Sequence, residues 1–521
     1  MTGMYTHRFA TILKTTLSGL LAVGLAAATA APALGQASPA TTTFTTLATF
    51  NGTDGQSPVY VGLVQGLDGN FYGTTKGGGA NKVCFNPNDP KKVGCGTVFK
   101  ITPGGTLTTL HSFDGTDGSF PKAGLVLASN GNFYGTTSNG GASTSSSCPS
   151  AFNGQNLGCG TVFEITPGGT LTTLHSFDGT DGSVPLDGLV QASNGNFYGT
   201  TYTGGASSVC PNGCGTVFEV TPSGTLTTLH SFDKTDGALP YAGLVQASNG
   251  NLYGTTDAGG VSISCPENNV FTELGCGTVF EITSSGTLTT LHNFGITDGS
   301  FPVDGLVQAT DGNFYGTTSL GGSNCSGGLD PGCGTVFKIT PAGTLTTLHS
   351  FDSTDGSQPF AGLVQATDGN FYGTTVAGGT NTGCGTIFEI TPGGTLTTLV
   401  DLGSGSTKGV CDPFGGLLQA TNGNFYGTTT VGDGTVFSLA VGLGPFVATN
   451  TASGGVGMDV TILGNNLTGS TSVTFNGVQA TFNVVSSTEI TTTVPSGATT
   501  GKVQVKTPSG TLSSNVNFRV P

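Results

Sequence analysis

Charged residues are scarce in this sequence, and basic residues are the scarcer kind. Only 8% of the 521 residues are charged, and 14 Lys and Arg stand against 29 Asp and Glu, which gives a net charge of −15. Nucleic acid is therefore not an expected partner, because basic patches bind the phosphate backbone. The acidity favours solubility. Tryptophan is absent, which counts modestly against stacking on carbohydrate, although Tyr and Phe can serve the same purpose.

The common catalytic motifs are missing as well. The sequence has no phosphate-binding loop, no dinucleotide fingerprint and no nucleophile elbow. We therefore assign no catalytic residue from a motif. Binding, a structural role and carboxylate-based cleavage of a polymer stay open as function classes.

Long apolar runs are also rare, and the clearest one lies near the N-terminus. Residues 15–31 are small and apolar, two basic residues precede them, and candidate cleavage sites follow near Gly35 and Ala37. This order predicts a secretory signal over residues 1–37. An uncleaved anchor is the alternative, but it would suit a longer apolar run. We expect an exported chain, extracellular or at the cell surface, with no transmembrane segment after cleavage.

One repeated segment dominates the chain between Phe44 and Ala440. The tract FYGTT begins at Phe71, Phe133, Phe197, Phe314, Phe371 and Phe425, and LYGTT begins at Leu252. A period of roughly 60 residues is typical of propellers and other arrays, because one unit cannot bury its faces alone. The 90 glycines recur at fixed turn positions, which argues against a disordered chain.

Each repeat is predicted to contain four short strands. The segments GLVQA, NFYGTT, GTVFEIT and TLTTLHSF are rich in Val, Thr, Phe, Tyr and Leu and are bounded by turn residues. Asn194-Gly195 and its counterparts predict a type I′ turn between the first two strands. Pro167-Gly168 predicts a tight turn between the last two. Two hairpins make a four-stranded antiparallel meander, which favours an all-β propeller over a parallel β-helix.

The two ends of the repeat array complement each other. Residues 44–50 match the fourth strand alone, whereas residues 416–439 supply the first three strands without a fourth. The strand count closes if the N-terminal strand completes the last blade, and this closure removes exposed sheet edges. We therefore predict a seven-bladed β-propeller over residues 44–440.

The twelve cysteines agree with export. Ten form pairs in the loop between the second and third strands of five successive repeats: Cys84/Cys95, Cys148/Cys159, Cys210/Cys214, Cys265/Cys276 and Cys325/Cys333. Cys384 and Cys411 fall in two loops that a propeller places on the same face, so we predict a sixth bridge. An even count in an exported chain indicates disulfides. Zinc is the alternative for the short Cys210–Cys214 spacing, and the lack of neighbouring His disfavours it.

Two repeated sets of polar residues are candidate metal ligands. Five histidines share one position of the fourth strand, namely His111, His175, His230, His292 and His349. They fall in different blades, so we expect structural roles rather than one metal centre. The interblade loops carry Asp114/Asp117, Asp178/Asp181, Asp233/Asp236 and Asp352/Asp355. Such carboxylates can bind calcium, but Asx-turns explain them without an ion. No cofactor is our main prediction, and calcium is the alternative.

The repeats diverge just after the loop proline, where the chain enters the inner strand. The differing residues are Tyr60, Lys122, Leu186-Asp187, Tyr241, Val303-Asp304, Phe360 and Phe414. In a propeller they ring the mouth of the central channel, and together they would suit a polar polymer or a peptide. Drift in a tolerant loop is the competing explanation. Glycoside hydrolysis needs two carboxylates beside one bond. Asp187 and Asp304 could approach across the channel, but the near-identical blades give little sign of a differentiated acid and base.

Residues 445–521 differ from the repeats. Cysteine disappears and Thr alternates with Val, a pattern that predicts the short strands of a β-sandwich. The blocks Gly464–Leu467, Val473–Gly477, Val494-Pro495 and Gly501–Val505 resemble an IPT/TIG domain. This resemblance implies an immunoglobulin-like sandwich over residues 445–521 that serves as a spacer or an adhesive module.

The repeat itself also resembles a known family. The patterns GTVFEITPxGTLTTLHSF and GLVQAxxGNFYGTT resemble the GloVer tandem repeat of bacterial extracellular proteins, the choice-of-anchor family. The resemblance implies an exported, surface-associated protein without assigned chemistry. Members commonly end in a sorting tail, whereas this sequence ends in Val516–Pro521, so the mode of anchoring stays open.

These observations lead to one main functional hypothesis and two alternatives. We expect a secreted or cell-surface, non-catalytic binding protein that uses the disulfide-bearing face of the propeller. Its expected partner is an extracellular polysaccharide or a surface protein. The first alternative is an extracellular polysaccharide lyase or glycoside hydrolase, and the second is a structural component of the cell envelope.

Overall fold

The computed structural model describes residues 42–521, apart from 82–83, 85–93, 144, 149–156, 262–264, 266–274, 324–331 and 381–382. The predicted signal segment, residues 1–37, lies outside the described residues. Residues Thr41–Pro521 form one compact unit. The described residues are all-β except for one short 3-10 helix, η1 (Gly405–Thr407). Within this part of the chain, no helix has the length and apolarity that a membrane span requires.

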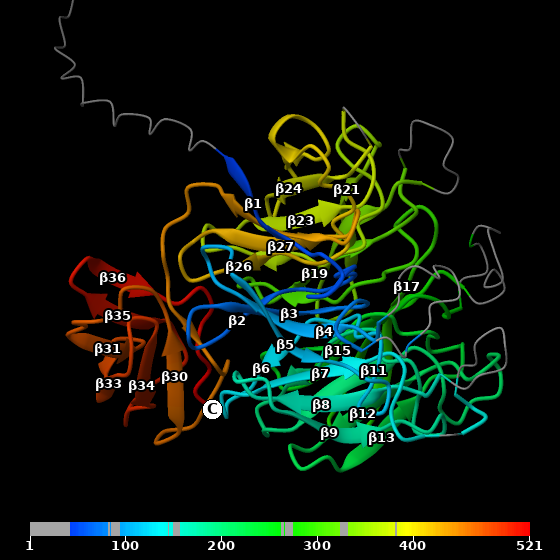
Figure 1. Ribbon diagram of the computed structural model, residues 1–521, viewed down its shortest axis with the longest axis horizontal. Helices are drawn as coiled ribbons and strands as arrows, with labels where there is room; N and C mark the ends of the chain where they lie inside the picture. The colour runs from blue at the N-terminus through cyan, green and yellow to red at the C-terminus, as the bar shows by residue number, and fades with distance from the viewer. Residues whose placement is uncertain are drawn as a thin grey trace, which may run out of the picture. The chain divides into compact units, whose positions relative to one another are not determined.

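The repeats fold into four-stranded antiparallel sheets, which we call blades 1–7 (Figure 1). Blade 1 contains β2 (Val64–Gln65), β3 (Phe71–Thr75), β4 (Thr97–Ile101) and β5 (Leu107–Ser112). Blade 2 contains β6 (Val126–Leu127), β7 (Phe133–Thr137), β8 (Thr161–Ile165) and β9 (Leu171–Ser176). Blade 3 contains β10 (Val190–Gln191), β11 (Phe197–Thr201), β12 (Thr216–Val220) and β13 (Leu226–Ser231). Blade 4 contains β14 (Val245–Gln246), β15 (Leu252–Thr256), β16 (Thr278–Ile282) and β17 (Leu288–Asn293).

The remaining blades have the same strand order. Blade 5 contains β18 (Val307–Gln308), β19 (Phe314–Thr318), β20 (Thr335–Ile339) and β21 (Leu345–Ser350). Blade 6 contains β22 (Val364–Gln365), β23 (Phe371–Thr375), β24 (Thr386–Ile390) and β25 (Leu396–Asp401). Blade 7 contains β26 (Leu418–Gln419), β27 (Phe425–Thr429), β28 (Thr435–Ala440) and, from the other end of the array, β1 (Thr43–Thr49). The architecture is the all-β propeller that the sequence predicts.

Each blade is held to the next by aromatic side chains of the second strand. All five residues of β11 are buried, as they are in the second strand of every blade. Tyr134 stacks on Phe197 of the following blade with ring centroids 4.0 Å apart. The glycine of the tract is required by close packing, because a Cβ at Gly199 would lie 2.7 Å from Phe218 Cζ. The FYGTT aromatics are therefore core residues.

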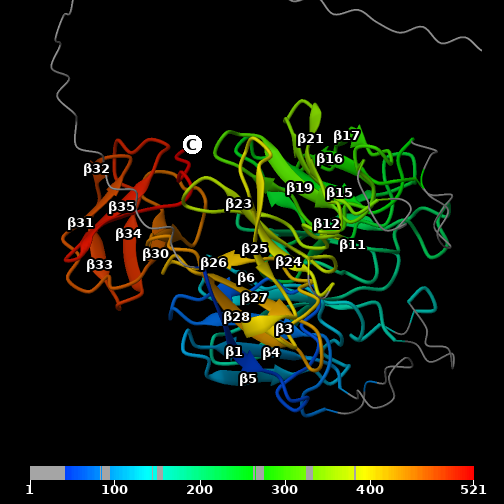
Figure 2. The ribbon, with the colours of Figure 1, turned by 90° about the horizontal axis from the view of Figure 1, so that it is seen from above.

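The ring closes through the pairing of its two ends. The N-terminal strand β1 pairs antiparallel with β28, from Thr43 opposite Ala440 to Thr49 opposite Thr435, with a bulge between Thr46 and Ala48. Figure 2 shows β1 and β28 side by side. Phe71 of blade 1 and Tyr426 of blade 7 add an aromatic contact at 4.0 Å across the same junction. The predicted closure is therefore present.

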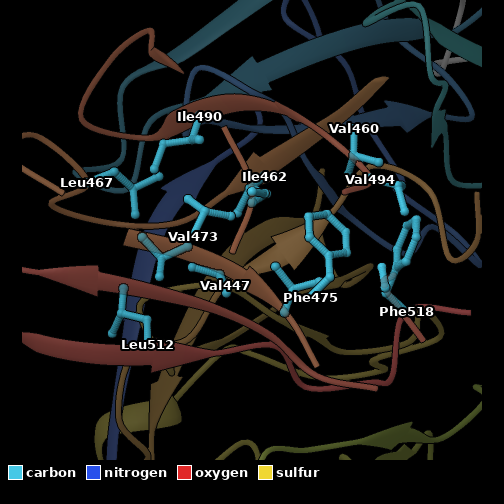
Figure 3. Packing of buried hydrophobic residues seen from close by; sticks show 14 residues of the cluster. Val447, Val460, Ile462, Leu467, Val473, Phe475, Ile490, Val494, Leu512 and Phe518 are labelled. Carbon is cyan, nitrogen blue, oxygen red and sulfur yellow. The ribbon is translucent and has the colours of Figure 1, made fainter. Parts of the chain in front are cut away.

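The C-terminal residues form two further four-stranded sheets. One contains β29 (Ala448–Thr449), β30 (Asp459–Leu463), β34 (Glu489–Thr493) and β33 (Phe482–Val484). The other contains β32 (Val478–Gln479), β31 (Ser472–Phe475), β35 (Val503–Thr507) and β36 (Gly510–Ser513). Their buried side chains, among them Ile462, Val473 and Phe475, point toward one another between the sheets (Figure 3). This is the β-sandwich arrangement that alternating strands favour.

The loops of the propeller lie on two opposite faces. One face carries the inserts between second and third strands together with the interblade loops, and bridges such as Ser183–Thr203 join the two kinds of loop. We call it the disulfide face. The other face carries the tight hairpins, and the C-terminal sandwich hydrogen-bonds to it, for example from Thr488 Oγ1 to the Leu67 carbonyl at 2.8 Å. Among the described residues, no hydrogen bond joins the sandwich to the disulfide face.

Candidate binding site at the mouth of the central channel

A strained residue directs each interblade loop into the channel. The residue before the loop proline has φ between 52° and 58° in every blade, at Ser57, Phe120, Val184, Leu239, Phe301, Gln358 and Asp412. Residues other than glycine seldom adopt this conformation, and β-branched Val184 is the most costly case. Sequence reasoning missed this feature, because a residue before proline ordinarily takes an extended conformation.

Hydrogen bonds hold the strained residue in place. In blade 4 the Leu239 N–H donates to the Cys214 carbonyl at 2.8 Å, and the Leu239 carbonyl accepts the Asp257 N–H at 3.2 Å. The same pair of bonds recurs in the other blades, for example around Val184 in blade 3. The disulfide loops therefore fix the backbone that enters the channel mouth.

Four residues predicted to ring the mouth pack against one another instead. The ring of Tyr60 lies 5.3 Å from Tyr241, 5.3 Å from Phe414 and 6.4 Å from Phe360. Tyr202, which was not predicted, lies 5.7 Å from Tyr241. Tyr60 belongs to blade 1 and Tyr241 to blade 4, so these side chains reach across the channel. We call Tyr60, Tyr202, Tyr241, Phe360 and Phe414 the mouth cluster.

Lys122 occupies the position in blade 2 that Tyr60 occupies in blade 1. The inner strands of these blades are in close contact, since a Cβ at Gly124 would lie 2.6 Å from the Gly62 carbonyl oxygen. Lys76 lies at the same junction, because its carbonyl oxygen and Pro121 Cδ both lie within 3.0 Å of a Cβ built on Gly96. Burial, together with the charge of Lys76, lowers the pKa of Lys122 to about 8. No ion pair to Lys122 occurs among the described residues.

Asp257 is an acidic group that sequence reasoning missed. It directly follows the second strand of blade 4, at the position where blade 2 has Ser138 and blade 5 has Ser319. Burial raises the pKa of Asp257 to about 7. Burial also raises the pKa of Tyr202 and Tyr241, and the charge of Asp257 adds to the rise in both. Asp257 therefore lies close to the mouth cluster. Comparison of the seven residues that follow FYGTT would have found it.

Asp187 and Asp304 line one cavity below the mouth cluster. This cavity has a volume of about 310 Å³, and its wall consists mainly of the Gly-Leu pairs that open the inner strands, with Tyr60 beside them. Asp187 accepts the Gly243 N–H and Asp304 accepts the Gly362 N–H, each at 2.5 Å, so each carboxylate bridges two blades. Burial raises the pKa of both carboxyls, and the charge of Asp187 adds to the rise at Asp304.

The loop aspartates and the histidines form local pairs. Asp117 Oδ2 lies 2.7 Å from His111 Nε2, and Asp117 Oδ1 accepts the Asp114 N–H. Asp114 Oδ1 in turn accepts the Thr116 hydroxyl. The arrangement repeats at Asp178 and Asp181 with His175, and the His–Asp pair also occurs at His230, His292 and His349. No group of three or more possible metal ligands gathers among the described residues, so the structure adds nothing in favour of the calcium alternative.

The disulfide face carries most of the predicted bridges. The structure contains Cys84–Cys95, Cys148–Cys159, Cys210–Cys214, Cys265–Cys276 and Cys384–Cys411. The last of these joins the insert of blade 6 to the interblade loop that follows, as the common face required.

Cys333 belongs to the one predicted bridge whose pairing the described residues do not test. A bridge from Cys333 to Cys325 is not among those described, because Cys325 lies outside the described residues. Cys333 itself is fully buried in the core that blades 5 and 6 share, and its Sγ lies 3.0 Å from Ser353 Oγ. Cys333 is disulfide-bonded, so its oxidised state agrees with the prediction. Its pairing with Cys325 in particular stays a prediction.

The chain belongs to the Gloeobacter/Verrucomicrobia repeat family. The model of that family matches residues 23–148, 149–329 and 269–485. These matches cover the propeller blades and part of the C-terminal sandwich. No curated protein matches the chain.

Several solved structures are similar in fold. A fungal alcohol oxidase of the AA5 family in complex with copper is 12% identical, with 89% of this chain and 98% of that chain covered and a TM-score of 0.46. A gluconolactonase from Xanthomonas campestris is 13% identical, with 60% and 91% covered and a TM-score of 0.32. PorZ, a surface component of the type-IX secretion system of Porphyromonas gingivalis, is 15% identical, with 87% and 58% covered and a TM-score of 0.39. Likeness at this level carries no argument about activity.

Proposed function

We propose that this chain is an exported, non-catalytic binding protein of the cell surface or extracellular space. Its ligand binds on the disulfide face, at the mouth cluster with Lys122. Residues 1–37 serve as the signal segment, and residues 445–521 form an IPT/TIG-type spacer against the opposite face. The disulfides suit an oxidising compartment.

One observation carries the proposal. The seven blades repeat the same buried strands, yet they differ at the few positions that converge on the channel mouth. There the rings of Tyr241 and Phe360 each contact the ring of Tyr60, and blade 2 contributes Lys122. Aromatic side chains with a few polar groups are the usual lining of a binding site. Blades 3 and 5 carry the aliphatic residues Leu186 and Val303 at the equivalent positions, so the fold does not require an aromatic ring there.

A binding screen with matched variants tests this function. Residues 38–521 are screened against extracellular polysaccharides and peptides, and each hit is assayed for cleavage. We expect at least one ligand that is bound and not cleaved, and we expect Tyr241→Ala and Phe360→Ala to weaken it by ~10-fold or more, because aromatic contacts dominate such sites. Asp311→Asn on the hairpin face is the control. Binding that both mouth variants leave unchanged would contradict the proposal.

The paired carboxylates favour a second candidate, an enzyme that cleaves a polysaccharide. Asp187 and Asp304 line the same cavity, and the raised pKa of both carboxyls keeps a proton available for an acid role. If cleavage accompanies binding in the screen, Asp187→Asn and Asp304→Asn are measured next. Loss of turnover in both, with binding retained, would establish the enzyme in place of the binding protein.

A further inference from the structure

Two opposite charges lie at the channel mouth without neutralising each other. Lys122 of blade 2 and Asp257 of blade 4 belong to non-adjacent blades, and no ion pair joins them. No donor among the described residues hydrogen-bonds the Asp257 carboxylate. The hydrogen bond that Asp257 makes is from its backbone N–H to the Leu239 carbonyl. Lys122 and Asp257 are both half-buried, and a charge that is partly removed from water and has no partner carries a cost in free energy. Two such charges at one site therefore call for an explanation.

The other blades show that the fold does not need these charges. At the position of Asp257, Ser138 donates its hydroxyl to the Phe120 carbonyl at 2.9 Å, and Ser319 does the same to the Phe301 carbonyl at 3.0 Å. The carboxylate of Asp257 cannot donate to the equivalent Leu239 carbonyl. At the position of Lys122, blade 3 has the buried Leu186. Blade 4 thus has a charged residue where blades 2 and 5 have a hydrogen-bonded serine, and blade 2 has a charged residue where blade 3 has a buried leucine.

The residues at the channel mouth are suited to bind an ammonium group and a carboxylate of a ligand. The Asp257 N–H donates to the carbonyl of Leu239, two residues before Tyr241, at 3.2 Å, and Tyr202 holds in blade 3 the position that Asp257 holds in blade 4. A carboxylate beside aromatic faces attracts an ammonium group. Lys122 has no ion pair among the described residues, so its ammonium attracts a carboxylate.

We propose that the mouth binds a zwitterionic short peptide, with its carboxylate at Lys122 and its ammonium at Asp257, lying over the mouth cluster. This inference rests on the proposed function and names its ligand class. An acidic glycan would use Lys122 and leave Asp257 unpaired. A neutral glycan would use neither charge. A ligand with both charges satisfies both residues.

Blocked and unblocked glycine peptides provide the test. Peptides of about two to five residues extend by roughly 3.5 Å per residue, so a length series finds the spacing of the two sites. Each is titrated calorimetrically into residues 38–521 with free ends, N-acetylated, C-amidated and with both ends blocked. We expect the free peptide of one length to bind best, and each block to weaken it by ~10-fold or more, because a charge-assisted hydrogen bond is lost.

Two variants assign the ends of the peptide. Lys122→Leu and Asp257→Ser introduce the residues that other blades carry, so the fold is kept, and the thermal midpoint checks this. In Lys122→Leu the free and C-amidated peptides should bind equally, whereas N-acetylation still weakens binding. In Asp257→Ser the pattern should reverse. Asp311→Asn, matched to Asn194 and its counterparts, should behave as wild type.

Other outcomes overturn the inference. Equal binding of free and fully blocked peptides would do so, as would the absence of binding by any peptide. Binding of a uronate oligosaccharide that falls in Lys122→Leu and is unchanged in Asp257→Ser would replace the peptide by an acidic glycan. A polymer ligand from the earlier screen that ignores both charges would leave the proposed function standing and remove this refinement.

Discussion

The second strand of each blade and the residues around the channel mouth are a few residues apart in sequence, yet they follow opposite rules. The strands repeat FYGTT with one change, Leu252 in blade 4, because in the other junctions the Tyr packs on the Phe of the next blade and each glycine faces a ring. The mouth positions differ from blade to blade, as Lys76, Tyr202 and Asp257 show. Among otherwise similar blades, the positions that differ are those that the packing of the repeated strands does not constrain. The difference separates the scaffold from the candidate site inside one molecule.

The largest expected effect comes from breaking the scaffold. Phe218 is fully buried and contacts Phe177 of the preceding blade at 5.2 Å. We expect Phe218→Ala to lower the free energy of unfolding by about 3–5 kcal/mol, since a large cavity opens in a packed core. Phe360→Ala, in the half-buried mouth cluster, is the matched substitution and should lower the free energy of unfolding by less. Denaturation midpoints measure both, and an equal loss would erase the distinction between scaffold and mouth.

A smaller effect separates two disulfides. The bridge Cys384–Cys411 spans 27 residues and joins two loops, whereas Cys210–Cys214 spans 4 residues within one loop. Chain-entropy arithmetic assigns the longer loop about 3.5 kcal/mol and the shorter about 2 kcal/mol. We expect replacement of both cysteines by alanine to destabilise the chain more for the first pair. Thermal melts of the two double variants test the order, and the reverse order would be a failure of the prediction.

The smallest effect concerns the channel carboxyls and depends on pH. Burial raises the pKa of Asp187 and Asp304 in the folded chain. The folded state therefore holds protons that the unfolded chain releases near pH 4, so this stability is present at low pH and lost as pH rises through the folded pKa. We expect a lower thermal midpoint at pH 8 than at pH 5. Asp187→Ala with Asp304→Ala, the residue of blades 4 and 6, should flatten the difference.

Most of the scaffold could be predicted from the sequence, and little of the site could. Strands, hairpins and the pairing of residues 44–50 with the last blade follow from local patterns that occur several times. The meeting of Tyr60 with Tyr241 does not, because it depends on how far a side chain reaches across the channel. Asp257 was missed because a single charge after a strand ordinarily reads as a solvated loop residue. The left-handed residues before proline contradict the usual preference.

The pairing of β1 with β28 also has a consequence for how the chain matures. Its partners, such as Thr43 and Ala440, stand at opposite ends of the repeat array. The first strand to be synthesised is therefore among the last to find its place, and until then it stays an unsatisfied edge. Contacts of such long separation slow folding. The interval before closure is when this chain is most exposed to wrong pairing with its own near-identical blades or with a second copy, so assistance by a chaperone would matter most at that moment.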